Sequence, residues 1–183
     1  MIYHLSLKNL GLIVGILLVA VHAMALVSPA SGQSILRHFP RNKFIGTILL
    51  AIATIWSFWL IATMDLGEFS AMRHMMLFAI PVAGVLMWYF VDEFLAVRSL
   101  GMLALLASEP LLESAFLKTP ESRLLLVILA YAWIVAGLFW VGMPFTLRNQ
   151  IKWVTENSTR WKLASIGGIV YGALLIASAL LYY

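Results

Sequence analysis

Long apolar runs, separated by short polar connections, dominate the pattern of hydrophobic and polar positions along the chain. Five of these runs contain almost no charged residue: 10–27, 44–64, 75–91, 124–145 and 163–183. A helix needs about 20 apolar residues to cross the hydrocarbon core of a bilayer. The pattern therefore predicts five transmembrane helices.

A sixth apolar region is interrupted by polar residues near its middle. Residues 99–108 are apolar, Glu109 and Pro110 break the run, and 111–117 resume it with Glu113 inside. By itself, such a region fits a re-entrant or surface segment as well as a full crossing.

The distribution of Lys and Arg decides whether this region crosses. Basic residues concentrate in the connections 28–43 and 144–162, and short connections rich in Lys and Arg face the cytoplasm. Two connections on the same side must be separated by an even number of crossings. Region 99–117 is therefore a fourth crossing, which we expect to be short or broken at Pro110.

We predict an all-α, polytopic integral membrane protein with six transmembrane helices in one domain, 1–183. Both termini then lie outside, and we expect a bacterial plasma membrane. Apolar and charged residues alternate at helical spacing in 146–162, which predicts an amphipathic helix on the cytoplasmic surface. The first run has the three-part pattern of a signal peptide, but it is long for one, and we expect it to remain a span.

Composition excludes several classes of protein. The chain of 183 residues is 63% hydrophobic and 11% charged, whereas soluble domains are about 25% charged. It contains no cysteine, which excludes disulfides, thiolate metal sites and a cysteine nucleophile. The net charge of +4 follows from the basic inner connections and does not indicate nucleic-acid binding.

Ionisable residues at membrane depth are costly and are therefore candidates for function. Glu109 and Glu113 are one helical turn apart, and Arg98 returns to nearly the same face. With Asp92 and Glu93 in the adjoining turn, these residues are candidates for an ion or proton pathway. The alternative is that Glu109 marks where a short helix reaches the surface. An ion pair within a tight hairpin would then explain the other charges.

Two histidines are candidates for cofactor binding. His22 lies within the first span and His74 opens the third. A histidine in a membrane can ligate haem or a metal, or it can relay protons. The two lie roughly 20 Å apart along the membrane normal, given the rise of a helix per residue, and cannot share one metal. The alternative for His22 is a hydrogen-bonded core position, and the sequence identifies no cofactor.

Small residues mark one face of the first and last spans. Gly11 and Gly15 are four residues apart, as are Ala164, Gly168 and Gly172. Such faces let helix backbones approach closely in lipid. They pack either within the chain or against a second copy or another membrane subunit, and both remain open here.

Three functions follow from these features. The small size, the short polar connections and the absence of any catalytic motif in the sequence favour a non-catalytic accessory subunit of a membrane complex, for example a redox or energy-converting one. A small proton- or cation-coupled transporter or channel would use the charges of the fourth span. A membrane enzyme or cofactor carrier for a lipid-soluble substrate would use His22 or His74.

Overall fold

The computed structural model describes residues 3, 5–91 and 93–183 of the chain. It is 87% helical, and the described residues contain no strand. Six of its eight α-helices are long and apolar enough to cross a membrane. The α-helices are α1 (Leu7–Val27), α2 (Pro29–His38), α3 (Lys43–Thr63), α4 (Arg73–Phe90), α5 (Leu95–Ala115), α6 (Arg123–Gly142), α7 (Phe145–Thr155) and α8 (Ser158–Leu181), with 3-10 turns at Phe39–Arg41 and Gly67–Met72.

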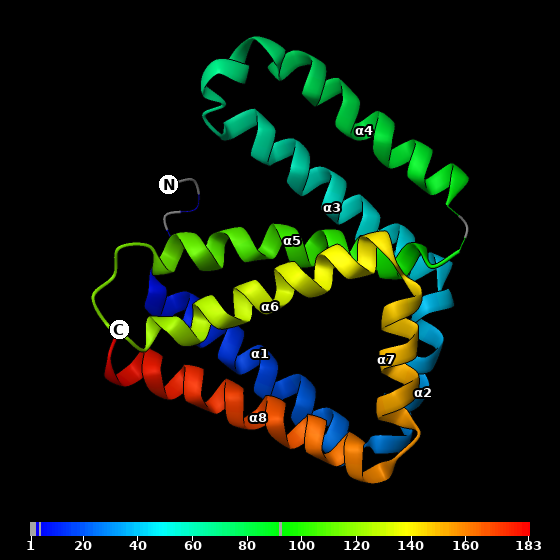
Figure 1. Cartoon of the computed structure of the whole chain (residues 1–183), viewed down its shortest axis with the longest axis vertical. Helices are drawn as coiled ribbons and strands as arrows, with labels where there is room; N and C mark the ends of the chain where they lie inside the picture. The colour runs from blue at the N-terminus through cyan, green and yellow to red at the C-terminus, as the bar shows by residue number, and fades with distance from the viewer. Residues whose placement is uncertain (1–2, 4, 92) are drawn as a thin grey trace.

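The long helices form two packed pairs and one hairpin that leans away from them. The pair α1 and α8 and the pair α5 and α6 lie close at the end that holds both chain termini, and they diverge toward the other end (Figure 1). There α2 and α7 run across the ends of the long helices and pack against each other. The start of α1 and the end of α8 lie at the same end of the bundle (Figure 1); the side of a membrane on which the termini lie stays a prediction.

Glycines set the closest approach within each pair. A Cβ atom on Gly15 would lie 2.9 Å from the carbonyl oxygen of Gly172, and one on Gly172 would lie 2.8 Å from that of Gly15. Gly101 of α5 and Gly137 of α6 make the same reciprocal contact, at 2.9 and 2.8 Å. Because lipid tails are as apolar as leucine, such backbone contacts are a main source of helix association in a bilayer.

The small-residue faces of the terminal helices are thus used within the chain. Gly11 lies against Ala179 and Tyr183, and Gly168 is covered by the ring of His22. With Gly15 and Gly172, they form one continuous seam between α1 and α8. The first apolar run is accordingly packed along the last one as an integral part of the fold.

Helix α5 is the most buried of the long helices. Its first residues, Leu95, Ala96 and Val97, are at most 1% exposed. A Cβ atom on Gly46 of α3 would lie 2.7 Å from the backbone nitrogen of Ala96, so α3 also approaches α5 closely. Helix α4, in contrast, packs against α3 and contains no buried residue.

The expectation that the fourth span is short or broken at Pro110 is wrong. Helix α5 runs for 21 residues with Pro110 inside it. A proline removes one backbone hydrogen bond, here to the carbonyl of Leu106. After the proline, Leu111 and Ala115 lie in one buried core with residues of α1, α6 and α8. Membrane helices commonly tolerate a proline where neighbouring helices pack around it.

The amphipathic helix in the second basic connection is shorter than the predicted 146–162. It ends at Thr155, and the side chain of Asn157 accepts a hydrogen bond from the backbone N–H of Thr159. This cap starts α8, because an asparagine at that position satisfies a donor that the first turn leaves free. Residues 158–162 therefore belong to the last long helix.

Helix α2 was not predicted. Pro29 occupies its first turn, where a missing N–H costs nothing, and Arg37 and His38 lie in its last turn, where positive charge is favourable. The sequence pattern does not indicate α2, because this helix is only ten residues long and lies between two long apolar runs.

We predict that Gly172→Leu destabilises the fold, whereas Gly167→Leu on the same helix does not. The former places a side chain against the backbone of α1, while a Cβ atom on Gly167 meets nothing within 4 Å. Overpacking typically costs about 1–3 kcal/mol. Thermal unfolding in detergent, followed by circular dichroism, measures the difference. Equal melting temperatures for the two variants would show that the α1–α8 seam is not where the structure places it.

Candidate functional site

Glu109 and Glu113 face the same recess at the end of the bundle that holds the termini. The recess has a volume of about 600 Å³ and is open on one side. The other residues that line it are Leu105, Ser108, Leu112, Phe116 and, from α6, Ile134. Two carboxyl groups one turn apart are therefore surrounded mainly by apolar side chains, and we call this cavity the carboxylate recess.

The segment before α1 contacts one of the two carboxyl groups. The backbone N–H of Tyr3 donates to both carboxylate oxygens of Glu113, at 3.3 and 3.4 Å. The Tyr3 hydroxyl accepts a hydrogen bond of 2.6 Å from Nε1 of Trp56, and the Tyr3 ring also contacts the ring of Trp59. The start of the chain, α3 and α5 therefore meet at one point.

Burial raises the pKa of Tyr3 above its ordinary value. The hydrogen bond from Trp56 opposes this shift, and the negative charges of Glu109 and Glu113 add to it. The phenol consequently stays neutral beside the two carboxyl groups over the physiological range of pH.

Basic residues at this end of the bundle bind backbone carbonyls instead of the carboxyl groups. Arg73 donates to the carbonyls of Ala62 and Met64, and Arg123 donates to those of Ala115 and Lys118. Across the described ranges, the structure shows no Lys or Arg within ion-pair distance of Glu109 or Glu113; its ion pair, Lys152 with Glu156, lies on α7. The carboxylate recess thus has negative groups without a cation from the described part of the chain.

The structure brings together only part of the predicted ion pathway. Arg98 lies eleven residues before Glu109, or roughly 16 Å along the helix axis. Its Nη1 donates to the carbonyl of Val141 at 2.9 Å. Glu93 is exposed in the turn before α5, and Asp92 lies outside the described residues. Between the levels of Arg98 and Glu109, α5 and α6 are in the close contact of Gly101 with Gly137.

The two histidines lie in different surroundings. Nδ1 of His22 is 2.8 Å from the carbonyl oxygen of Leu18, and its ring packs on Gly168 between α1 and α8. His74 is exposed at the start of α4. The residues that the structure describes include no group of three or more His, Cys, Asp or Glu able to hold a metal ion.

Sequence reasoning missed Tyr3. No spacing pattern links position 3 to position 113, because the contact depends on how α1 and α5 pack. The one available indication was Trp56, an indole in the middle of a span, far from the headgroups where tryptophan usually lies. The other mid-span indole, Trp133, packs against the apolar core formed by α1, α5, α6 and α8.

Comparisons of the chain with family models, with curated proteins and with solved structures found no match.

We predict that Tyr3→Phe reduces the pH dependence of stability in the alkaline range. A raised pKa means that the fold favours the neutral phenol. Its contribution to stability is complete below the ordinary tyrosine pKa of about 10 and is lost as the pH rises through the raised value. The wild type should therefore lose more stability than Tyr3→Phe between neutral pH and the region above that value.

Thermal unfolding over this pH range measures the difference, and Tyr89→Phe is the matched control, because Tyr89 is exposed and contacts the neighbouring Phe90. Parallel pH profiles for the wild type and Tyr3→Phe would contradict the burial of Tyr3.

Proposed function

We propose that this protein is an accessory subunit of a membrane complex and that its carboxylate recess binds a Lys or Arg side chain from a helix of a partner subunit. One observation carries the proposal: Glu109 and Glu113 lie together in an open, largely apolar cavity without a cation from the described part of the chain.

The energetics of charge in a bilayer support a partner cation. Charged side chains within membrane-spanning helices are costly, and such groups are usually paired. The Tyr3 backbone N–H satisfies part of the hydrogen-bonding capacity of Glu113, but it brings no net charge. A Lys or Arg from another helix would supply both the missing donors and the opposite charge.

The shape of the recess suits a helix. Leu105, Leu112 and Ile134 offer apolar contact on either side of the carboxyl groups. The recess is an open cavity, so a side chain from a neighbouring helix has room to enter it. An apolar stripe interrupted by one basic residue is the complementary surface that we expect on the partner.

The orientation in the membrane is part of the proposal. Helices α2 and α7 and the start of α8 carry Arg37, Arg148, Lys152, Arg160 and Lys162 at the end of the bundle opposite the termini. The positive-inside rule places this end in the cytoplasm and both termini outside, as in a bacterial plasma membrane. The carboxylate recess would then open in the outer leaflet.

We predict that the double variant Glu109→Gln/Glu113→Gln loses the partner, whereas Glu121→Gln retains it. Glutamine keeps the shape of glutamate but removes the charge, and Glu121 is an exposed carboxyl group at the same end. A photoreactive phenylalanine at Phe116, which lines the recess, should cross-link to a second polypeptide in native membranes. Its yield should fall at least about tenfold in the double variant, which corresponds to the loss of about 1.4 kcal/mol of binding.

Mass spectrometry of the cross-linked peptide provides the critical detail. The attachment point should lie in an apolar segment of the partner that contains Lys or Arg. Cross-links to lipid alone would contradict the proposal. So would a protein cross-link that forms in the same yield in the double variant and in Glu121→Gln.

A transporter that uses the same carboxyl groups predicts a different result. Glu109→Gln would then abolish proton or cation flux into liposomes that contain only this protein. We expect no flux above that of empty liposomes for either the wild type or Glu109→Gln, because α5 and α6 close tightly at Gly101 and Gly137 between the recess and Arg98. Flux that depends on Glu109 in the purified protein would favour transport over the accessory role.

A further inference from the structure

A second cavity with charged residues in its lining lies between the two amphipathic helices at the opposite end of the bundle. It has a volume of about 320 Å³ and lies between α2, the turn that follows α2, and α7. Three basic residues line it, Arg37, Arg148 and Lys152, against one acidic residue, Glu156. We call it the α2–α7 pocket, and the charged side chains that line it carry a net charge of +2.

Arg37 is held rigidly at one wall of the pocket. Its Nε donates to Oγ1 of Thr155 at 3.0 Å, and its Nη2 donates to the carbonyl of the same residue at 2.8 Å. Thr155 is only 4% exposed, so the anchor is buried. These two bonds involve Nε and Nη2, and the guanidinium carries two more N–H donors on Nη1.

Arg148 is positioned by an aromatic ring. Its guanidinium carbon lies 5.5 Å from the centroid of the Phe94 ring, within the range of a cation–π interaction. Phe94 itself adopts a left-handed backbone conformation, with φ of 58°, which is uncommon for a residue other than glycine. The turn before α5 therefore adopts an unusual conformation beneath this arginine.

Lys152 is the adaptable member of the group. Its Nζ lies 3.7 Å from a carboxylate oxygen of Glu156, and its side chain is 74% exposed. An exposed pair of this kind contributes little stability and exchanges readily for a stronger partner. The α2–α7 pocket therefore offers two positioned guanidinium groups and one mobile ammonium group.

We propose that the α2–α7 pocket binds the phosphate of an anionic phospholipid. Guanidinium groups bind phosphate through paired, charge-assisted hydrogen bonds, and basic pockets near the cytoplasmic surface of membrane proteins bind such headgroups. The charge of the pocket is complementary to this ligand. Its position among helices that run across the ends of the spans places it at the level of the headgroups.

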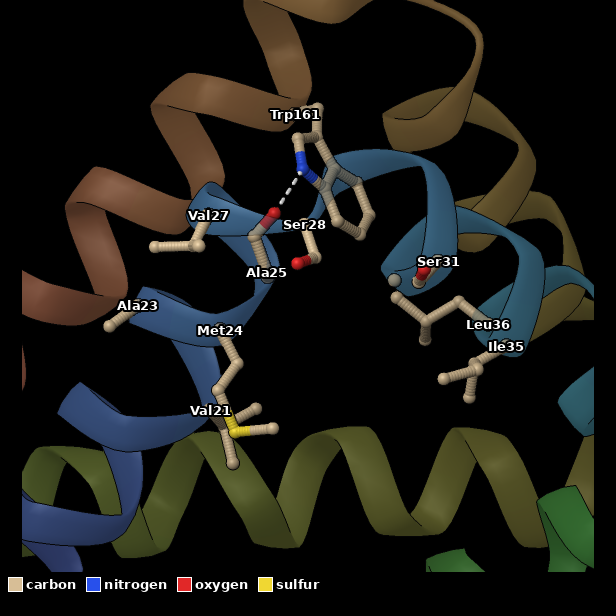
Figure 2. A pocket seen from close by; sticks show the side chains of 11 residues that line it. Val21, Ala23, Met24, Ala25, Val27, Ser28, Ser31, Ile35, Leu36 and Trp161 are labelled. Carbon is tan, nitrogen blue, oxygen red and sulfur yellow. Dashed lines mark hydrogen bonds between the residues drawn. The ribbon is translucent and has the colours of Figure 1, made fainter.

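A neighbouring apolar cavity favours a lipid over free phosphate. Helix α2 also borders a cavity of about 540 Å³, whose lining includes Val21 and Met24 of α1 and Ile35 and Leu36 of α2. These side chains point into one space, while the indole of Trp161 is held by a hydrogen bond of 3.0 Å to the carbonyl of Ala25 (Figure 2). Leu36 borders this cavity and Arg37, the next residue of α2, borders the α2–α7 pocket. An apolar surface suited to an acyl chain and a basic surface suited to a phosphate therefore lie on one short helix.

Lipid binding to the purified protein, measured by native mass spectrometry, tests this inference. We compare the double variant Arg148→Gln/Lys152→Gln with Arg160→Gln/Lys162→Gln. The control removes the same amount of charge at the same end of the bundle, but from residues that do not line the pocket. Each variant is first checked for a wild-type melting temperature, and Lys152→Gln alone replaces the double variant if that one unfolds.

The wild type and the control should each retain one molecule of phosphatidylglycerol in preference to phosphatidylcholine. Arg148→Gln/Lys152→Gln should bind phosphatidylglycerol at least about tenfold more weakly. Equal weakening in both variants would show general electrostatic attraction instead of a site, and an absence of preference between the two lipids would also overturn the proposal. Displacement of phosphatidylglycerol by inorganic phosphate at equal concentration would identify a soluble anion as the ligand and overturn the lipid assignment.

Discussion

The packing of the two helix pairs depends on one close backbone contact in each pair. Gly15 meets Gly172 between α1 and α8, and Gly101 meets Gly137 between α5 and α6, in each case with the carbonyl of one helix against the Cα of the other. Water does not drive helices together inside a bilayer, so close contact of this kind has to supply the attraction. The two pairs converge near the chain termini and separate toward α2 and α7 (Figure 1).

This arrangement leaves two charged sites at opposite ends of the molecule. Near the termini, the pairs hold Glu109 and Glu113 in an open recess and bring Tyr3 against them. At the other end, α2 and α7 bridge the separated pairs and place Arg37 and Arg148 around a pocket. The sites differ in what they lack: the first has negative groups without a cation from the described chain, and the second has more cations than anions. These two features are the basis of the proposed partner helix at one end and the proposed phospholipid at the other.

The sequence predicts the long helices well, because a run of about twenty apolar residues is typical of a helix that crosses a bilayer. The six long helices follow from the lengths of the apolar runs. Run lengths do not predict whether the helix continues through Pro110. Whether a proline breaks a helix depends on the packing around it, and here α5 continues for 21 residues with Pro110 buried inside it.

Contacts between segments that are far apart in the sequence could not be predicted from the sequence either. The pairing of Glu109 with Glu113 follows from helical periodicity alone, whereas the bond from Tyr3 to Glu113 depends on tertiary packing. The glycine faces were recognised from their spacing, but spacing alone does not say which helix covers them. Similarly, α2 carries too few residues to stand out from its neighbours, and Thr155, which anchors it, lies 118 positions from Arg37.

The central claim is that the glycine faces of the terminal helices pack against each other within one chain. The protein contains no cysteine, so a pair introduced at Gly11 and Ala179 reports on this contact without background. A Cβ atom on Gly11 would lie 3.2 Å from that of Ala179, close to the separation of about 3.8 Å in a disulfide. Oxidation in native membranes should give a disulfide within a single chain, identified by mass spectrometry of the linked peptides at monomer mass. Disulfide-linked dimers as the main product, or two free thiols, would contradict the packing on which the rest of the structure depends.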